Sequence, residues 1–355
     1  MTTVSLTQAS PWWEPRRHAD RRPALLARGK MMDAWRHGFA VRDFIEVETA
    51  VLQVSPGNEA HIAGFATDLC APDGGKERLY LHASPEFACK KLLGAGEERI
   101  FTFARVFRNG ERGPLHHPEF TMLEWYRARE PWRRLIEDCS WIVAEAARLA
   151  GAARLRYRDR EADPYTLPET MSVRDAFLRY AEVDLFETMD KAGVPDDRKL
   201  RIAAAQAAFE TAGDDTWSDV FSKLLTARVE PNLGVGRLTA LIDYPACEAA
   251  LARRCAHDPR VAERFELYAC GVELANGFGE LTDPAEQRRR FVAEMDERER
   301  IHGDRYPIDE DFLAALAFMP EASGIALGVD RLVMLATGAP SIEHVMWTPV
   351  VEPRA

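Results

Sequence analysis

The chain has 355 residues, a formal net charge of −11, and 46% apolar and 29% charged residues, values that are typical of a globular protein with a large core. The negative charge argues against a protein that coats nucleic acid, and no apolar run approaches the ~20 residues of a membrane span. Six cysteines without a CxxC pair, and an N-terminus without a signal-peptide core, favour a cytoplasmic protein with reduced thiols and no membrane partner.

The chain begins with an expected arm over residues 1–19, followed by an expected catalytic domain over 20–355. Apolar residues at helical spacing predict a helix over about 20–39. Alternation predicts a strand over 44–48 and a second one over 79–82, with a Pro-, Gly- and Asn-containing loop between them.

A helix is predicted to start at Ser84-Pro85-Glu86 and to end at Gly94. The start is indicated by a hydroxyl cap, a proline at the first helical position and an acidic first turn. From these three residues alone, a structural helix cap is a better interpretation than a functional site.

The next stretch, ARVFRNGERGPLHHPEFTMLEWY, spans residues 104–126. It predicts strands over 100–107 and 119–127, joined by a loop that holds Arg108 and two adjacent histidines. Such a loop can carry cations toward a phosphate-rich ligand. By itself, such a loop is more typical of a surface hairpin with a solvated loop.

Ala-rich and charged helical patterns predict a helical insertion over about 151–229. The other expected elements are helices over 132–150, 284–301, 309–318 and 330–336, and strands over 238–242, 264–269 and 324–329. Because helices and strands are interspersed without regular βαβ alternation, we expect an α+β fold, an antiparallel sheet flanked by helices.

Two further patterns carry chemistry. Three glutamates, Glu266, Glu273 and Glu280, occur in RFELYACGVELANGFGEL, where turns or bulges at 270–271 and 276–279 would bring them to one side. Converging carboxylates suit Mg²⁺ or an ammonium group. In GIALGVDRL, small residues allow a ligand close to the backbone, and the arginine can bind phosphate or stack on a base.

Taken together, these patterns resemble the catalytic core of class II aminoacyl-tRNA synthetases of the lysyl branch. The segment FRNGERGPLHHPEFTMLEWY resembles motif 2, and GIALGVDRL resembles motif 3. The helix predicted over about 20–39, together with the strand after it, resembles motif 1. The likeness covers about residues 20–355. A lysyl-tRNA synthetase carries an anticodon-binding domain before motif 1, and only about twenty residues precede it here. The chain therefore resembles the elongation factor P–lysine ligase family, a stand-alone synthetase-like domain. SPEF…KKLL, RVAERFELY and DRLVMLATGA support this likeness.

This resemblance implies that Arg108 and Arg331 are the catalytic residues, with Arg108 on the α-phosphate of ATP and Arg331 on the adenine side. Phe120 would stack on adenine and His116 would contact the outer phosphates. The implied ATP site contains Arg108, Asn109, Gly110, His116, His117, Phe120, Glu266, Leu267, Gly328 and Arg331. Mg²⁺ would be held by Glu266 and Glu273.

The same resemblance implies that a lysine or (R)-β-lysine substrate lies beside the nucleotide, with its amino groups among acids. The implied residues are Ser84, Pro85, Glu86, Glu124, Tyr126, Glu273, Asn276, Glu280 and Ala326. The implied acceptor is a lysine of elongation factor P, in a homodimer that uses no tRNA. The tRNA-charging enzymes usually have glycine at position 326, so the methyl group of Ala326 would reshape the pocket.

Three positions depart from the family pattern. Gly110 stands where motif 2 has glutamate, His117 where it has asparagine, and Ala50 where motif 1 has proline. The first two concern ATP recognition and the third concerns the dimer interface. Two other functions therefore remain open: lysine activation with a different acceptor, tRNA or another protein, and a non-catalytic paralogue that binds lysine or adenylate.

Overall fold

A computed structural model of the protein describes residues 11–351, so the first ten residues of the expected arm, and the last four of the chain, lie outside the described part. Its centre is an eight-stranded sheet with the order β1-β5-β6-β14-β13-β12-β11-β9. The strands of this sheet are β1 Ile45–Glu46, β5 Arg99–Phe107, β6 Glu119–Ala128, β9 Glu169–Ser172, β11 Thr239–Pro245, β12 Val261–Ala269, β13 Val272–Gly279 and β14 Ala322–Gly328. Only the two edge pairings, β1 with β5 and β11 with β9, are parallel. The predicted α+β fold with an antiparallel sheet is confirmed.

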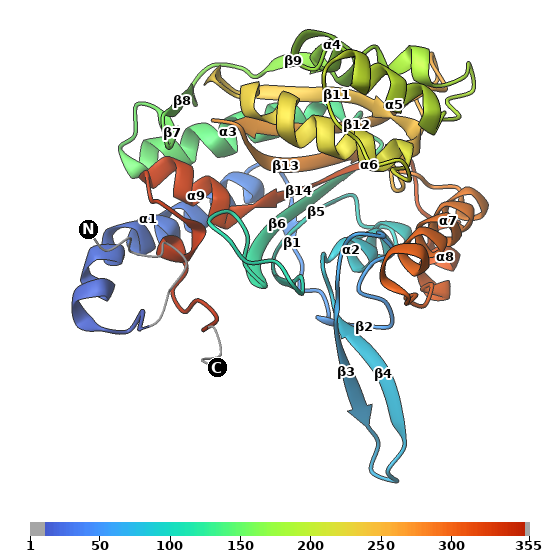
Figure 1. Ribbon diagram of the computed structural model, residues 1–355. Helices are drawn as coiled ribbons and strands as arrows, with labels where there is room; N and C mark the ends of the chain where they lie inside the picture. The colour runs from blue at the N-terminus through green and yellow to red at the C-terminus, as the bar shows by residue number, and fades with distance from the viewer. Residues whose placement is uncertain (1–10, 352–355) are drawn as a thin grey trace.

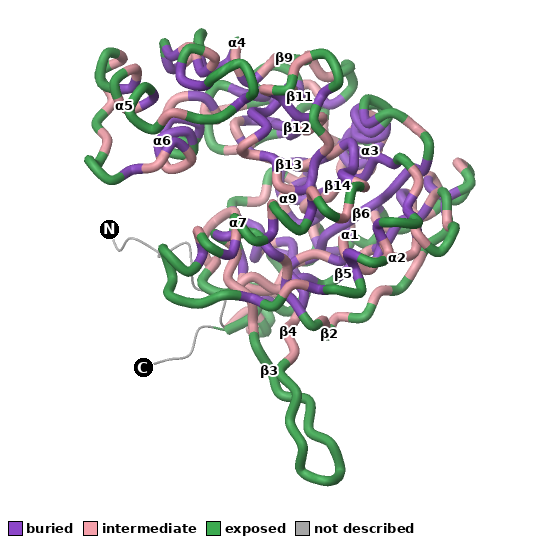
Figure 2. Tube along the Cα trace, turned by 90° about the vertical axis from the view of Figure 1, so that its right-hand side faces the viewer, coloured by how far each residue is buried: buried purple, intermediate pink, exposed green. Residues whose placement is uncertain are grey.

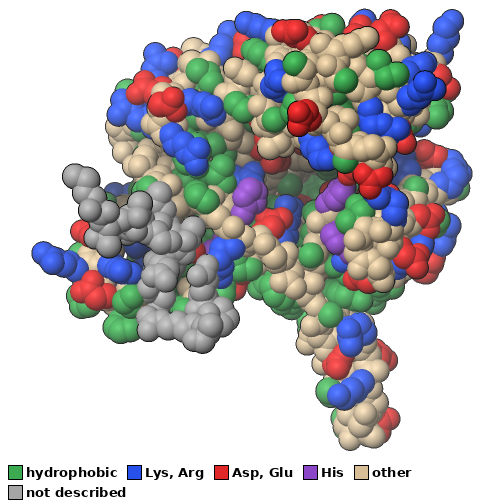
Figure 3. Space-filling model, viewed as in Figure 1, with side chains coloured by type: hydrophobic (Ala, Val, Ile, Leu, Met, Phe, Trp, Pro, Cys, Tyr) green, Lys and Arg blue, Asp and Glu red, His purple; other side chains and the backbone are tan. Residues whose placement is uncertain are grey.

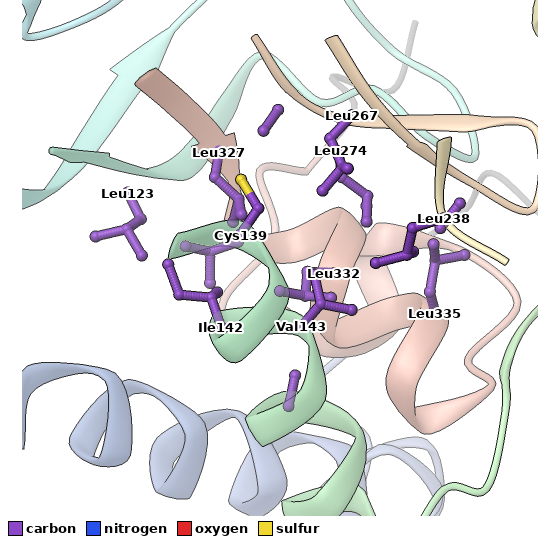
Figure 4. Packing of buried hydrophobic residues seen from close by; sticks show 14 of the residues in the cluster. Leu123, Cys139, Ile142, Val143, Leu238, Leu267, Leu274, Leu327, Leu332 and Leu335 are labelled. Atoms are coloured by element: carbon purple, nitrogen blue, oxygen red, sulfur yellow. The ribbon is translucent and has the colours of Figure 1, made fainter. Parts of the chain in front are cut away.

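Helices cover one face of this sheet completely (Figure 1). They are α1 Pro15–Ala40, α3 Arg133–Ala150 and α9 Val329–Thr337. Figure 4 shows where Leu267 and Leu327 of the sheet meet Ile142 of α3 and Leu332 of α9. Side chains alternate along a strand, so residues such as Leu123 and Trp125 enter this core while their neighbours face the other way.

The opposite face of the sheet is covered only at its ends (Figure 1). At one end lie α2 Glu86–Gly94, α7 Pro284–His302 and α8 Glu310–Leu316. At the other end lie α4 Val173–Tyr180, α5 Asp197–Gln206 and α6 Trp217–Leu224, which share a buried cluster with Leu241, Tyr244 and Tyr268 of β11 and β12. The part of the sheet between these two covers is where the site lies.

The remaining elements are short. Two small sheets have three strands each. One contains β10 Gly236–Arg237, β8 Arg160–Asp163 and β7 Leu155–Tyr157. The other contains β2 Leu52–Gln53, β4 Lys76–Leu81 and β3 Phe65–Cys70. Single helical turns lie at Leu185–Thr188, Leu225–Val229, Glu230–Asn232, Ala246–Glu248 and Ile342–Val345. None of the helices within residues 11–351 combines the length and apolarity that crossing a membrane requires. All six cysteines are free, as predicted.

Several predicted boundaries were wrong. The first helix begins at Pro15 instead of about residue 20, because Glu14 caps it by accepting from the amides of Arg16 and Arg17. The region 151–229 is not helical throughout: β7, β8 and β9 precede its helices, and β9 joins the main sheet. Pro85, expected at the first helical position, is the residue before it, while the Ser84 hydroxyl accepts from the Glu86 amide at 3.1 Å.

The hairpin β3–β4 was largely missed. It projects from the body and is exposed along nearly all its length (Figure 2). Because both faces meet solvent, its sequence lacks the apolar alternation that identifies a strand. The loop expected before β4 therefore contains a strand pair, Phe65–Cys70 with Lys76–Leu81.

The break expected at 276–279 was also wrong, because these residues continue β13 and pair with both β12 and β14. Their glycines serve close packing: a Cβ at Gly277 would lie 2.4 Å from the Phe265 ring. The turn predicted at Cys270-Gly271 is real, and both residues have positive φ. A register shift in the hairpin between β12 and β13 leaves Leu274 unpaired, so that Glu273 and Asn276 both line the same cavity.

Candidate active site

A cavity of about 160 Å³ opens on the uncovered part of the sheet. In Figure 3 the same face is hollowed at its centre, with histidine, acidic and basic side chains around the rim. Strands β6, β13 and β14 form the floor, and the loop between β5 and β6 forms one wall. Eleven of the predicted site residues line it: Ser84, Glu86, Arg108, His116, His117, Phe120, Glu273, Asn276, Ala326, Gly328 and Arg331.

Arg331 forms the centre of a polar group at one side of the cavity. Its Nη1 donates to Glu273 Oε2 at 3.1 Å, and its Nε donates to the Leu115 carbonyl at 3.1 Å. Its Nη2 lies 3.0 Å from His116 Nε2. Burial first, and then the adjacent Arg331, lower the pKa of His116. His116 is therefore a neutral acceptor toward the arginine when the cavity holds no anion.

Arg108 faces the same cavity from the end of β5. Its guanidinium lies 5.4 Å from the centre of the Phe120 ring, and its nearest carboxylate, Glu111, is 3.9 Å away. The Arg108 Nε is buried and has no hydrogen-bond partner among the described residues. A buried donor of this kind is costly unless a ligand accepts from it, so the geometry fits an anion between Arg108 and Arg331.

Two of the three positions that depart from the family pattern, Gly110 and His117, lie in the loop that carries Arg108. Gly110 has φ +80, a conformation in which a side chain is strained, and a Cβ there would meet nothing within 4 Å. The next residue, Glu111, brings a carboxylate to the cavity wall. His117 is buried, and its Nδ1 lies 2.6 Å from the Glu119 carbonyl. It therefore closes the base of the loop.

A buried acidic cluster lies behind the cavity, under β14. Glu124 accepts from the Ser84 hydroxyl at 2.5 Å and from the Tyr126 hydroxyl at 2.6 Å. Burial, followed by the nearby Glu86, raises the pKa of Glu124 to about 8. Glu280 lies 2.6 Å from Lys90, and burial raises its pKa to about 7 despite that lysine. This cluster is suited to receive positive charge.

The pKa of Glu124 predicts that stability falls as pH rises. In the unfolded chain this carboxyl loses its proton near pH 4.5, but in the folded protein it keeps the proton to about pH 8. Folding therefore takes up a proton between these values, and the free energy of unfolding falls by at most about 1.4 kcal/mol per pH unit from this group. Denaturant unfolding at pH 5.5, 6.5 and 7.5 should show a shallower slope for Glu124→Gln. An unchanged slope would contradict the assignment.

The predicted Mg²⁺ ligands are not equally available. Glu266 Oε2 accepts from Tyr244 and Tyr268, each at 2.5 Å, and Oε1 accepts from Arg264 at 2.7 Å. Glu273 uses only Oε2. Within residues 11–351, no three His, Cys, Asp or Glu side chains are placed to hold a metal by themselves. One carboxylate with an unused oxygen and one nearly saturated carboxylate fit Mg²⁺ bound mainly through phosphate oxygens and water.

Eight predicted site residues do not line this cavity. Pro85 lines a smaller neighbouring pocket, and Asn109 and Gly110 are exposed at the loop tip. Leu267 was misplaced: its side chain points into the helix-covered core (Figure 4), because it follows Glu266 on the strand and so faces the opposite way. Glu124, Tyr126, Glu266 and Glu280 are buried behind the wall.

The charged residues in or near the cavity that sequence reasoning missed include Lys90, Glu111, Glu230 and Arg264. Glu230 contacts the Tyr268 hydroxyl at 3.3 Å, and burial together with Glu266 and Glu273 raises its pKa to about 7. Nothing in a local pattern distinguishes these residues from the solvated charges of a helix or loop. Only the closeness of distant segments reveals them.

Comparison with known proteins gives a consistent result. The family model described as "tRNA synthetases class II (D, K and N)" matches residues 11–352. A protein of Proteus mirabilis (strain HI4320), named "Elongation factor P--(R)-beta-lysine ligase", is 40% identical over 330 residues, which are 92% of this chain and 94% of that protein. A protein of Avibacterium paragallinarum with the same name is 40% identical over 325 residues, 91% and 94% of the two chains.

Proposed function

The chain belongs to the class II tRNA synthetases of the D, K and N group, and we propose that it is an ATP-dependent ligase that activates (R)-β-lysine and transfers it to a lysine of elongation factor P. The single observation that carries this proposal is the cavity itself, where paired arginines lie at one end and buried carboxylates at the other. The two similarly named relatives support the choice of substrate and acceptor.

The first step joins the amino-acid carboxylate to the α-phosphorus of ATP and releases pyrophosphate. It requires cations on the phosphates and correct alignment, and no protein nucleophile. Arg108, with its unpartnered Nε, and Arg331 supply positive charge on two sides of the cavity. Phe120 offers a ring face beside Arg108 for the adenine base.

We propose that Glu273 and Glu266 would hold Mg²⁺ beside the triphosphate of ATP. Glu273 would supply its unused Oε1, and Glu266 would contribute its Oε1, which accepts from Arg264 while both tyrosines bind Oε2. The ion would supply positive charge that neutralises the phosphates. If Glu273 held the ion, Arg331, which now pairs with Glu273, would be available to ATP.

The second step transfers the acyl group to the acceptor. The ε-amino nitrogen of a lysine on elongation factor P attacks the activated carbonyl, loses a proton, and displaces AMP to leave an amide. We propose that the enzyme works as a homodimer without tRNA. Exposed apolar side chains around the first edge of the sheet, Val41, Ile45, Leu52 and Val54, offer a surface for a second copy of the chain.

The proposed activation is tested by amino-acid-dependent exchange of labelled pyrophosphate into ATP. We expect exchange with (R)-β-lysine, weaker exchange with lysine, and none above background with norleucine, which lacks the distal ammonium. Exchange that does not depend on an added amine substrate would contradict the proposal. Stable charging of tRNA with the amino acid would show that tRNA, and not elongation factor P, is the acceptor.

Ala326→Gly is expected to change the choice between lysine isomers. Ala326 lines the cavity and lies opposite Glu124 on one neighbouring strand and Asn276 on the other. Removing its methyl group makes space beside the α-carbon of the substrate. A difference of one methyl group changes selectivity by about tenfold or more, so the ratio of kcat/KM for lysine to that for (R)-β-lysine should rise by about that factor. An unchanged ratio would remove Ala326 from the account of specificity.

A further inference from the structure

Lys90, on α2, is a fully buried lysine. Its side chain has 0% exposure, and its Nζ lies 2.5 Å from Glu86 Oε1 and 2.6 Å from Glu280 Oε2. A buried ammonium is costly unless it is paired and hydrogen-bonded. Burial lowers the pKa of Lys90, but the two carboxylates outweigh burial and raise it above its ordinary value. This side chain is therefore a permanent positive charge inside the protein.

The position of Lys90 relative to the cavity is informative. Glu86 lines the cavity and keeps 13% of its side chain exposed, whereas Glu280 is 1% exposed and lies behind it. Lys90 itself is not part of the wall. It takes one oxygen of the Glu86 carboxylate from the protein side, and the other oxygen has no partner among the described residues. Lys90 thus fixes the orientation of a carboxylate that faces the ligand space.

The charge count of this region leads to the same conclusion. Glu86 lies close enough to raise the pKa of both Glu124 and Glu280, and Glu280 also raises the pKa of Glu124. In the empty cavity Glu124 keeps its proton to about pH 8. When the ammonium groups of a substrate displace that proton, one lysine among three ionised carboxylates gives the cluster a net charge of −2. A substrate with two ammonium groups and a reacting carboxylate brings two positive charges to this end of the cavity. Without Lys90 the cluster would hold one negative charge more than such a substrate can compensate.

We propose that Lys90 is a positioning residue for the amine substrate. It holds Glu86 in place to receive an ammonium group, and it compensates Glu280 so that the cluster matches a diamino acid. This inference rests on the proposed function and adds to it a determinant of amine recognition that touches no substrate. Lys90 acts only through the carboxylates it binds.

The test compares KM values in the pyrophosphate exchange assay. Lys90→Met should raise KM for the amino acid by at least about tenfold, the scale of a lost charged hydrogen bond, and leave KM for ATP within about threefold. The matched control is Lys91→Met, the next residue on the same helix. Lys91 binds Asp309 and Asp311 instead of the cluster, so its loss should leave both KM values unchanged.

A second variant separates positioning from a purely structural role. Lys90→Met/Glu280→Gln removes one positive and one negative charge, so the net charge of the cluster is unchanged and folding should be preserved. Its reference is Glu280→Gln alone, because Glu280 belongs to the amine end of the site. If Lys90 positions Glu86, KM for the amino acid is higher in the double variant than in Glu280→Gln. If Lys90 only neutralises Glu280, the two variants have the same KM and the inference is overturned.

The two proposals fail in different ways. If the wild-type enzyme shows no exchange with any diamino acid, the proposed function is wrong. If the wild-type enzyme shows exchange and the double variant has the same KM for the amino acid as Glu280→Gln alone, only the inference about Lys90 is wrong. Equal increases of KM for ATP and for the amino acid would also contradict it, because they indicate a general loss of structure.

Discussion

Arg108→Ala is expected to lower kcat/KM for amino-acid-dependent exchange by about 10²–10³-fold, the range seen when one preorganised donor to a developing charge is removed. The physical reason is that the Arg108 guanidinium lines the cavity with a buried, unpartnered Nε, beside the ring of Phe120. Steady-state exchange kinetics with ATP and (R)-β-lysine measure the effect.

Arg105→Ala is the matched control for this change. Arg105 lies on the same strand, but it binds Glu119 at 2.7 Å and Thr121 at 2.9 Å and does not line the cavity. Its loss removes an equal charge and should leave kcat/KM within about threefold, since exposed ion pairs contribute little. Similar losses in both variants would show that general charge, and not the placement of Arg108, matters.

Gly324→Ala is expected to disrupt the amine end of the site and to destabilise the protein. A Cβ at Gly324 would lie 2.3 Å from Glu280 Oε1 and 2.3 Å from the Tyr126 ring. Both neighbours are buried and held by other contacts, so the chain must shift. Overpacking of this kind costs about 1–3 kcal/mol, and displacement of Glu280 and Tyr126 should raise KM for the amino acid. Thermal unfolding and the exchange assay measure the two effects.

Gly328→Ala, on the same strand, controls for the loss of backbone freedom alone. A Cβ at Gly328 would meet only the flexible Arg331 side chain, at 3.7 Å and beyond. The melting temperature of the Gly328→Ala variant should therefore stay close to that of the wild-type protein, whether or not the variant binds nucleotide normally. Equal melting temperatures for Gly324→Ala and wild type would refute the claim that the space behind β14 is filled.

Most of the fold could be predicted because the buried parts of the chain carry strong local signals. Asp283 and Asp309 cap α7 and α8 close to the predicted starts of these helices at 284 and 309, and β5, β6 and β14 were found within two residues of their ends. The exposed hairpin β3–β4 gave no such signal. Gly277 and Gly279 were interpreted as turn residues. Glycine is needed at these positions because Phe265 and Glu263 pack closely against the strand.

The site was predictable where a motif places the residue and not where packing does. Arg108 and His116 lie on one loop and Arg331 follows 215 residues after His116, yet each lines the cavity as the motifs implied. Lys90 and Lys91 look alike in the sequence. Successive residues on a helix point about 100° apart, so one lysine is fully buried between Glu86 and Glu280 and the other is part-exposed at the surface. The positions of acidic residues in the sequence do not indicate that Glu124 and Glu280 are buried.

The most direct test of the account is transfer of labelled (R)-β-lysine to purified elongation factor P. With ATP and Mg²⁺ present and tRNA absent, the account predicts that the label becomes attached to elongation factor P through an amide bond that survives denaturation. The label should sit on a single lysine and should not appear when Arg108→Ala replaces the wild-type enzyme. Absence of label on an elongation factor P that a known ligase does modify, while pyrophosphate exchange proceeds, would contradict the account.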